Sequence, residues 1–169
     1  MKRTVLKFGF FGLITALILF TLALVFAKSL DYSTQEIIGY LTMAASLIFT
    51  YFGIKHYRDK ENNGAISIGK ALQIGLLISI FAGLGFGIVD YIYTTMINPD
   101  FAVEYQEHML SSMREELPAE EFAIKSEELK QQMKDYGSPS FMAFIMFFSV
   151  VIIGFIISLI SALILQRKN

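Results

Sequence analysis

The chain contains no cysteine, only two histidines and only three prolines among its 169 residues. Without cysteine there is neither a disulfide framework nor a thiolate site, and two isolated histidines leave little material to ligate zinc, haem or an iron–sulfur cluster. We therefore expect no cofactor. Charged residues are also scarce at 17%, whereas 54% of the residues are hydrophobic, which would require too large an interior for a soluble domain. The composition predicts an integral membrane protein.

Four apolar runs are long enough to cross the hydrocarbon core of a bilayer, which requires roughly 17 to 25 residues of helix. They extend approximately over Phe8 to Ala27, Ile37 to Ile54, Ala71 to Ile92 and Phe141 to Leu165. All three prolines fall outside these runs, so the helices lack the proline breaks that often mark transporter binding sites. The sequence thus predicts an all-α fold, a four-helix transmembrane bundle, as a single integral membrane domain over residues 1–169.

The first run follows Lys2, Arg3 and Lys7, as the apolar part of a secretory signal peptide would. Its length of about 20 residues exceeds the 7 to 15 residues of the apolar region of a usual signal peptide, and a clean cleavage pattern of small residues is lacking. We expect a retained helix, with cleavage as the alternative.

Basic residues gather at alternate ends of the predicted helices, which indicates the orientation. The amino terminus, the segment between the second and third runs, and the carboxyl terminus together hold nine basic and two acidic residues. The opposite side holds five basic and twelve acidic residues. We expect a multi-pass protein of the cytoplasmic (inner) membrane, with both termini in the cytoplasm and residues about 98–140 extracytoplasmic.

The segment KHYRDKENNG, residues 55–64, reads as a cytoplasmic turn between two spans. Asn62 to Gly64 suit a turn because Asn and Gly tolerate positive φ. Two roles remain open for its charges. We favour a topology signal with a tight turn, and the alternative is contact with a cytoplasmic partner made by Arg58, Asp59, Lys60 and Glu61.

The same region carries a family resemblance. The stretch from Tyr51 to Ser79, YFGIKHYRDKENNGAISIGKALQIGLLIS, resembles the signature of the uncharacterised bacterial membrane family called domain of unknown function 4199, found mainly in Bacteroidetes. The match is most specific in YRDKENNG and GKAL, and the order of four spans with a polar segment before the last is similar along essentially the whole chain. The resemblance implies a multi-pass membrane protein without an assigned activity, so no catalytic or binding residue can be transferred.

Small residues recur every four positions in the third run, which lays a groove along one helix face. A shorter series of the same kind lies in the fourth run, so we expect these two helices to pack closely, with homodimerisation as the alternative. The two series are Ala71, Gly75, Ser79, Gly83 and Gly87, and Gly154, Ser158 and Ala162. The string GLGFG at 83–87 is not a dinucleotide motif, because no strand precedes it.

Asp90 is the only acidic residue within an apolar run, and such residues are functional candidates by default. It stands at the outer end of the third run, and Lys28 ends the first run at a similar height. We favour an interfacial pair between Asp90 and Lys28, with proton or ion handling by Asp90 as the alternative.

Residues 98–140 predict two amphipathic helices that form a hairpin between the third and fourth spans. Pro118 is expected in the first turn of the second helix and Gly137 at its end. Glu104 and His108 are spaced so that they could share a metal ion, although we expect them to be solvated, and the many acids disfavour nucleic acid and anionic lipid. We favour two stripes that pack on each other, with a protein partner as the alternative. The stripes are Phe101, Tyr105, Met109, Met113 and Leu117, and Phe122, Leu129, Met133 and Tyr136.

Two classes of function are consistent with this sequence. We favour a non-enzymatic accessory or scaffold protein, in contact with the lipid bilayer, that binds a membrane or periplasmic protein or forms a homo-oligomer. The alternative is a small oligomeric protein for permeation of ions or small molecules. An enzyme ranks third because no Ser-His-Asp, paired-acid or metal constellation is visible.

Overall fold

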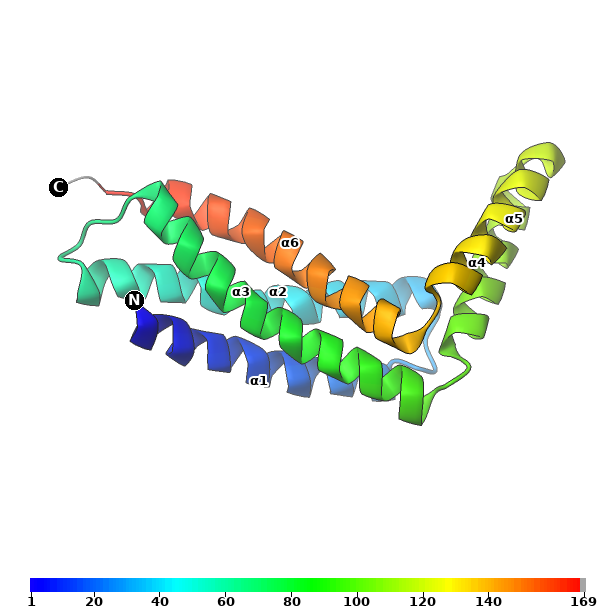
Figure 1. The fold of residues 1–169 in the computed structure, drawn as a ribbon, viewed down its shortest axis with the longest axis horizontal. Coiled ribbons are helices and arrows are strands. Elements are labelled where there is room, and N and C mark those ends of the chain that lie inside the picture. Colours follow the sequence, from blue (N-terminus) through cyan, green and yellow to red (C-terminus); the bar gives the residue numbers. More distant parts are fainter. Residues whose placement is uncertain (168–169) are drawn as a thin grey trace. The chain divides into compact units, whose positions relative to one another are not determined.

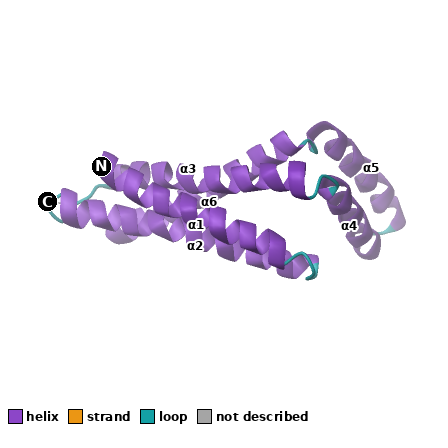
Figure 2. Ribbon diagram, turned by 90° about the horizontal axis from the view of Figure 1, so that it is seen from below, coloured by secondary structure: helices purple, strands orange, loops and turns teal. Residues whose placement is uncertain are grey.

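The computed structural model describes residues 1–167, and within them the regular structure is six α-helices and two π-helical turns, η1 (Tyr57–Glu61) and η2 (Tyr93–Ile97), with short connections (Figure 1). The helices are α1 (Lys2–Phe26), α2 (Tyr32–His56), α3 (Ile68–Ile92), α4 (Phe101–Glu116), α5 (Ala119–Tyr136) and α6 (Pro139–Leu165). Figure 2 shows that these elements are helices joined by loops. In chain order, the shorter pair α4 and α5 comes between α3 and α6. The predicted all-α fold, with a helical pair inserted before the last long helix, is confirmed.

Helices α1, α2, α3 and α6 are long and apolar enough to cross a membrane. Helices α2, α3 and α6 each contain one of the predicted runs, and α1 contains the first run except for Ala27, which caps it. All four extend beyond their runs at one end or both, because polar residues at a helix end can stay helical while their side chains reach water. The start of α2 is fixed by Asp31, whose side chain accepts hydrogen bonds from the Thr34 N–H at 2.9 Å and the Thr34 hydroxyl at 2.7 Å. These bonds favour the charged carboxylate and lower the pKa of Asp31.

The predicted turn over residues 55–64 is wrong in its extent, because most of it is helical. Helix α2 runs to His56 and continues as a π-helical turn, η1 (Tyr57–Glu61), so the chain reverses only in residues 62–67. Asn63 and Gly64 there have φ values of 52° and 83°, which is the positive φ expected of them. Charged side chains do not break a helix, whereas residues with positive φ must lie outside it. The helical region therefore continues through the charged residues and ends just before Asn63 and Gly64.

The first compact unit comprises Met1–Val89 and the part of α6 from Ile145 onward. Its helices run lengthwise beside one another (Figure 1), and two hydrophobic clusters fill the interior, one around Ile54 and Ile78 and one around Leu47 and Phe86. Half of the most apolar stretch of the third candidate span is buried, against 22% in α1 and α6, so α3 is the central helix. The outward faces expose large apolar side chains, as a lipid-facing surface requires.

The second compact unit, Asp90–Phe144, contains the hairpin of α4 and α5. The guanidinium of Arg114 lies over the Phe122 ring at 5.3 Å and joins the two helices. Pro118 is the N-cap residue of α5, directly before the first turn in which it was expected. Gly137 ends α5 as expected, with an N–H that donates to the Met133 carbonyl at 2.8 Å. A Cβ at Gly137 would collide with that carbonyl oxygen. Glycine is therefore required here because the Met133 carbonyl lies so close, and not because the residue has a positive φ.

Candidate functional site

The two series of small residues lie against each other where α3 contacts α6. A Cβ placed on Gly75 would collide with the side chain of Ser158, and a Cβ placed on Gly154 would collide with that of Ser79. Only glycine permits helices to approach so closely at these positions. Three other members of the two series are also buried, namely Ala71, Gly83 and Ala162. The remaining member, Gly87, is half-buried.

Hydroxyl groups accompany the glycines at this contact. A hydrogen bond of 3.3 Å joins the hydroxyls of Thr50 on α2 and Ser79 on α3, both fully buried. The Ser79 hydroxyl also donates to the Gly75 carbonyl at 2.9 Å, and the Ser158 hydroxyl donates to the Gly154 carbonyl at 2.6 Å. The bond between Thr50 and Ser79 therefore links α2 and α3. Because each serine donates to a carbonyl of its own helix, neither leaves a free donor for a ligand.

A second close contact, between α1 and α3, is not among the predictions from the sequence. A Cβ on Gly9 would lie 2.7 Å from the Phe81 ring, and a Cβ on Gly85 would lie 2.8 Å from the Ala16 Cβ. Gly12 is buried in the same helix face. The available signal was the spacing of Gly9, Gly12 and Ala16 at i, i+3 and i+7, which places three small residues on one face of α1.

The charges predicted in the turn make contacts within the chain. Arg58 is only 8% exposed, and its Nε donates to the Asp59 carboxylate at 2.6 Å while its Nη1 donates to the Leu165 carbonyl at 3.3 Å. Beside it, Ile66 and Arg167 exchange two backbone hydrogen bonds of 3.0 and 3.1 Å. The end of α6 is therefore tied to the segment between α2 and α3.

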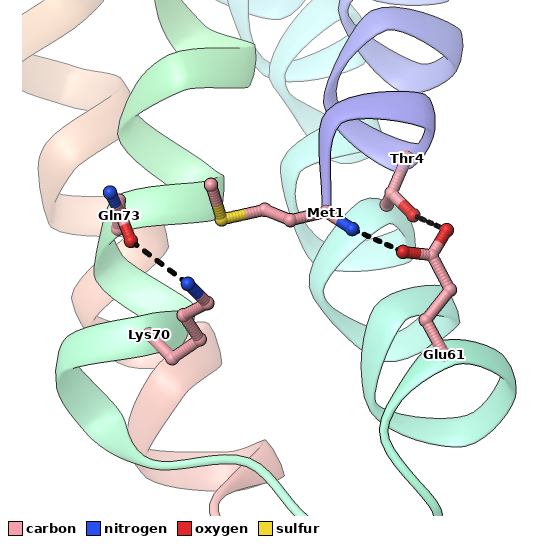
Figure 3. A network of polar contacts seen from close by, with 5 residues as sticks. All are labelled: Met1, Thr4, Glu61, Lys70 and Gln73. Atoms are coloured by element: carbon pink, nitrogen blue, oxygen red, sulfur yellow. Dashed lines mark hydrogen bonds and ion pairs between the residues drawn. The ribbon is translucent and has the colours of Figure 1, made fainter.

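Glu61, at the end of η1, contacts the start of α1 (Figure 3). Its carboxylate accepts hydrogen bonds from the amino group of Met1 and, at 2.5 Å, from the hydroxyl of Thr4. Lys60 is exposed and makes no ion pair with the part of the chain that the structure describes. The fold thus uses three of the four charges, and the prediction of a cytoplasmic partner for them stays a prediction.

Asp90 lies near the end of α3 and is 6% exposed. Among the described residues, its Oδ2 is the buried side-chain oxygen that lacks a hydrogen-bond partner. The hydroxyl of Thr94 donates to the main-chain carbonyl of Asp90 at 2.8 Å and leaves the carboxyl group unaffected. Lys28 is exposed and belongs to the other compact unit, so the pair with Asp90 stays a prediction.

The hairpin buries few of its side chains. Helix α4 contains no buried residue, and in α5 the buried residue is the polar Ser126. Val103 and Ile124 are 57% and 64% exposed, and most residues of the two predicted stripes are half-buried. The two stripes therefore shield each other only in part.

The carboxylate of Glu104, considered above as a metal ligand with His108, accepts a hydrogen bond from the Asn98 side-chain amide at 2.8 Å. Within residues 1–167, no group of three or more His, Asp and Glu side chains is arranged to hold a metal ion. The bond to Asn98 joins the start of α4 to the residue that follows the π-helical turn η2 after α3.

No curated protein and no solved structure matches this chain. A family described as "Protein of unknown function (DUF4199)" matches residues 7–167. This range includes the hairpin and all four candidate spans, apart from the first residues of α1. The match is with the family that the stretch from Tyr51 to Ser79 resembles. The chain belongs to the DUF4199 family of proteins of unknown function.

Proposed function

We propose that this protein is a non-enzymatic accessory or scaffold protein of the membrane, and that its hairpin binds a protein partner. The observation that carries the proposal is that no apolar side chain between residues 101 and 136 is buried. A pair of helices with half-buried stripes gains little from its own packing, so a partner that covers the stripes would stabilise both.

The composition of this surface favours a protein over other ligands. Methionine and aromatic side chains in the stripes adapt to different partner shapes, as Met109 and Met133 would at an interface. The acidic residues of the hairpin disfavour nucleic acid and anionic lipid. The partner would present an apolar strip bordered by basic residues, in the membrane or the periplasm.

Site-specific photocrosslinking in intact cells tests this proposal. A photoreactive residue at Tyr105 or Tyr136, the exposed members of the two stripes, should give a defined crosslinked band. The same residue at Gln131, an exposed polar position on the opposite side of α5, should not. The variant Tyr136→Glu, expressed to the same level, should lose a crosslink formed from Tyr105. Equal crosslinking from all three positions, or none from the two stripe positions, would contradict a specific partner.

We further propose an inner-membrane location in bacteria, with both termini in the cytoplasm and residues about 98–140 outside. The segregation of nine basic residues to one set of helix ends supports this orientation. Because the chain has no cysteine, Ser112→Cys and Ser67→Cys each create a single thiol. An impermeant maleimide applied to whole cells should label the first and not the second, and the reverse pattern would invert the topology.

A second candidate function, permeation of protons or ions by an oligomer, is favoured by the buried and unpartnered Oδ2 of Asp90. Liposome flux that is lost in Asp90→Asn, while the protein remains folded, would establish it. Flux at the level of empty liposomes would leave the accessory function as the proposal.

A further inference from the structure

A shallow groove of about 380 Å³ opens between α1 and α2 near the end of the first unit that carries the amino terminus. Its floor is aromatic, formed by Phe8 and Phe11 of α1 and by Phe49 and Phe52 of α2. The ring centroids of Phe11 and Phe49 are 5.7 Å apart, so the two rings join α1 to α2. Phe11 and Phe52 are each 44% exposed, which leaves the floor open to the surroundings of the bundle.

The rim of the groove carries an excess of positive charge. Lys55 and Lys60 line it, both are exposed, and neither forms an ion pair with a residue that the structure describes. Asp59 also lines the groove, but its carboxylate accepts a hydrogen bond from the Arg58 guanidinium at 2.6 Å. The Asp59 charge is thereby largely matched by Arg58, and the two lysine charges remain for an anion.

We propose that this groove binds one anionic phospholipid. An acyl chain lies along the phenylalanine floor, and the phosphate accepts hydrogen bonds from the ammonium groups of Lys55 and Lys60. The order of the side chains supports this occupant, because the apolar floor gives way to cations toward the polar end of α2, as the acyl chain of a phospholipid gives way to its phosphate. A transmembrane helix of another protein would leave both lysines without an anion, which disfavours it as the occupant.

The absence of tryptophan from the chain provides a direct probe of this site. Phe52→Trp places a single tryptophan in the groove, and Phe155→Trp places one on α6 at nearly the same exposure, 44% against 45% for the native side chains. Each variant is reconstituted in phosphatidylcholine vesicles that contain increasing fractions of brominated phosphatidylglycerol. Quenching is compared with that by brominated phosphatidylcholine, which corrects for the depth of each fluorophore.

We expect phosphatidylglycerol to be preferred over phosphatidylcholine by about fivefold to tenfold at Phe52→Trp, and not at Phe155→Trp, given the attraction of two lysines near the membrane surface. The same preference at both positions would overturn the proposal, because it would reflect the general attraction of a basic protein surface. If Phe52→Trp does not fold, Phe11→Trp tests the same groove.

Charge variants identify the groups responsible. In the Phe52→Trp background, Lys55→Gln combined with Lys60→Gln should reduce the preference to near one. Lys70→Gln is the matched control, since Lys70 has the same expected topology but its Nζ donates to Gln73 at 3.3 Å outside the groove (Figure 3). A preference that survives the double change, or one that Lys70→Gln removes equally, would refute the assignment of the phosphate to this rim.

Discussion

The bundle of long helices and the hairpin are both α-helical, yet their side chains pack in different ways. In the first compact unit, Phe86, Leu47 and Val150 are fully buried, and glycines bring α3 within backbone contact of its neighbours. Between residues 101 and 136 of the second unit, no apolar side chain is buried. The contrast follows from the solvent that each unit is expected to meet.

In a membrane, lipid tails solvate apolar side chains as well as a neighbouring helix does, so helices associate through close van der Waals contact and hydrogen bonds. Small residues and buried hydroxyls provide both in the bundle. In water, two short helices gain stability only from the apolar area that they remove from solvent, and the hairpin removes little. The bundle helices are therefore held together by close contact, whereas the hairpin leaves its stripes partly uncovered, as the proposed binding of a protein partner requires.

Overfilling the close contact in the bundle should have the greatest effect. Gly75→Leu forces a large side chain into Ser158, and we expect the free energy of unfolding in detergent to fall by about 3 kcal/mol. Gly39→Leu is the control, because no atom lies within 4 Å of a Cβ at Gly39, and it should change stability by less than about 0.5 kcal/mol. Similar losses in both variants would show that α3 and α6 do not depend on close approach.

Truncation of one phenylalanine in each unit compares their packing directly. Phe86 is fully buried against Phe20 at 4.8 Å between ring centroids, so Phe86→Ala should cost about 3 kcal/mol. Phe122 is half-buried beneath Arg114, and Phe122→Ala should cost about 1 kcal/mol or less. Unfolding in detergent, followed by circular dichroism, measures both. A hairpin variant as damaging as the bundle variant would mean that the hairpin is as tightly packed as the bundle.

Removal of the buried arginine at the end of α2 should have an intermediate effect. Arg58→Ala leaves the Leu165 carbonyl and the Asp59 carboxylate without a donor, at a cost of about 2 kcal/mol. Lys60→Ala, two residues away and exposed, should lie within about 0.5 kcal/mol of the native protein. Thermal stability of the two purified variants gives the comparison, and equal values would mean that the contact of Arg58 with α6 does not stabilise the fold.

The smallest expected effect is the pH dependence of the α2 cap. Hydrogen bonds from Thr34 lower the pKa of Asp31 in the folded protein below its unfolded value near 3.9. The carboxylate cap therefore stabilises the fold fully above about pH 4, and this contribution is lost as pH falls through the folded pKa. Asp31→Asn should remove that part of the acid dependence in a thermal scan against pH. An unchanged profile would show that the cap does not contribute.

Several features were predictable from the sequence because they depend on residues close together in the chain. The length of an apolar run decides whether a segment crosses a bilayer, so the four candidate spans and the insertion between the last two followed directly. The positive φ at Asn63 and Gly64 is equally local. The predicted turn over residues 55–64 was too long, because charged residues such as Arg58 and Lys60 are as compatible with a helix end as with a loop.

Contacts between residues far apart in the chain were decided only when the helices packed. The spacing of Gly75 and Ser158 indicated a close contact, but Gly9 and Gly85 became recognisable as a second one only through the position of α1. Likewise, Arg58 contacts Leu165 and Glu61 contacts Thr4 because four helix ends meet there. Hydrophobicity and periodicity are properties of a segment, whereas the partner of a side chain depends on the tertiary arrangement of all the helices.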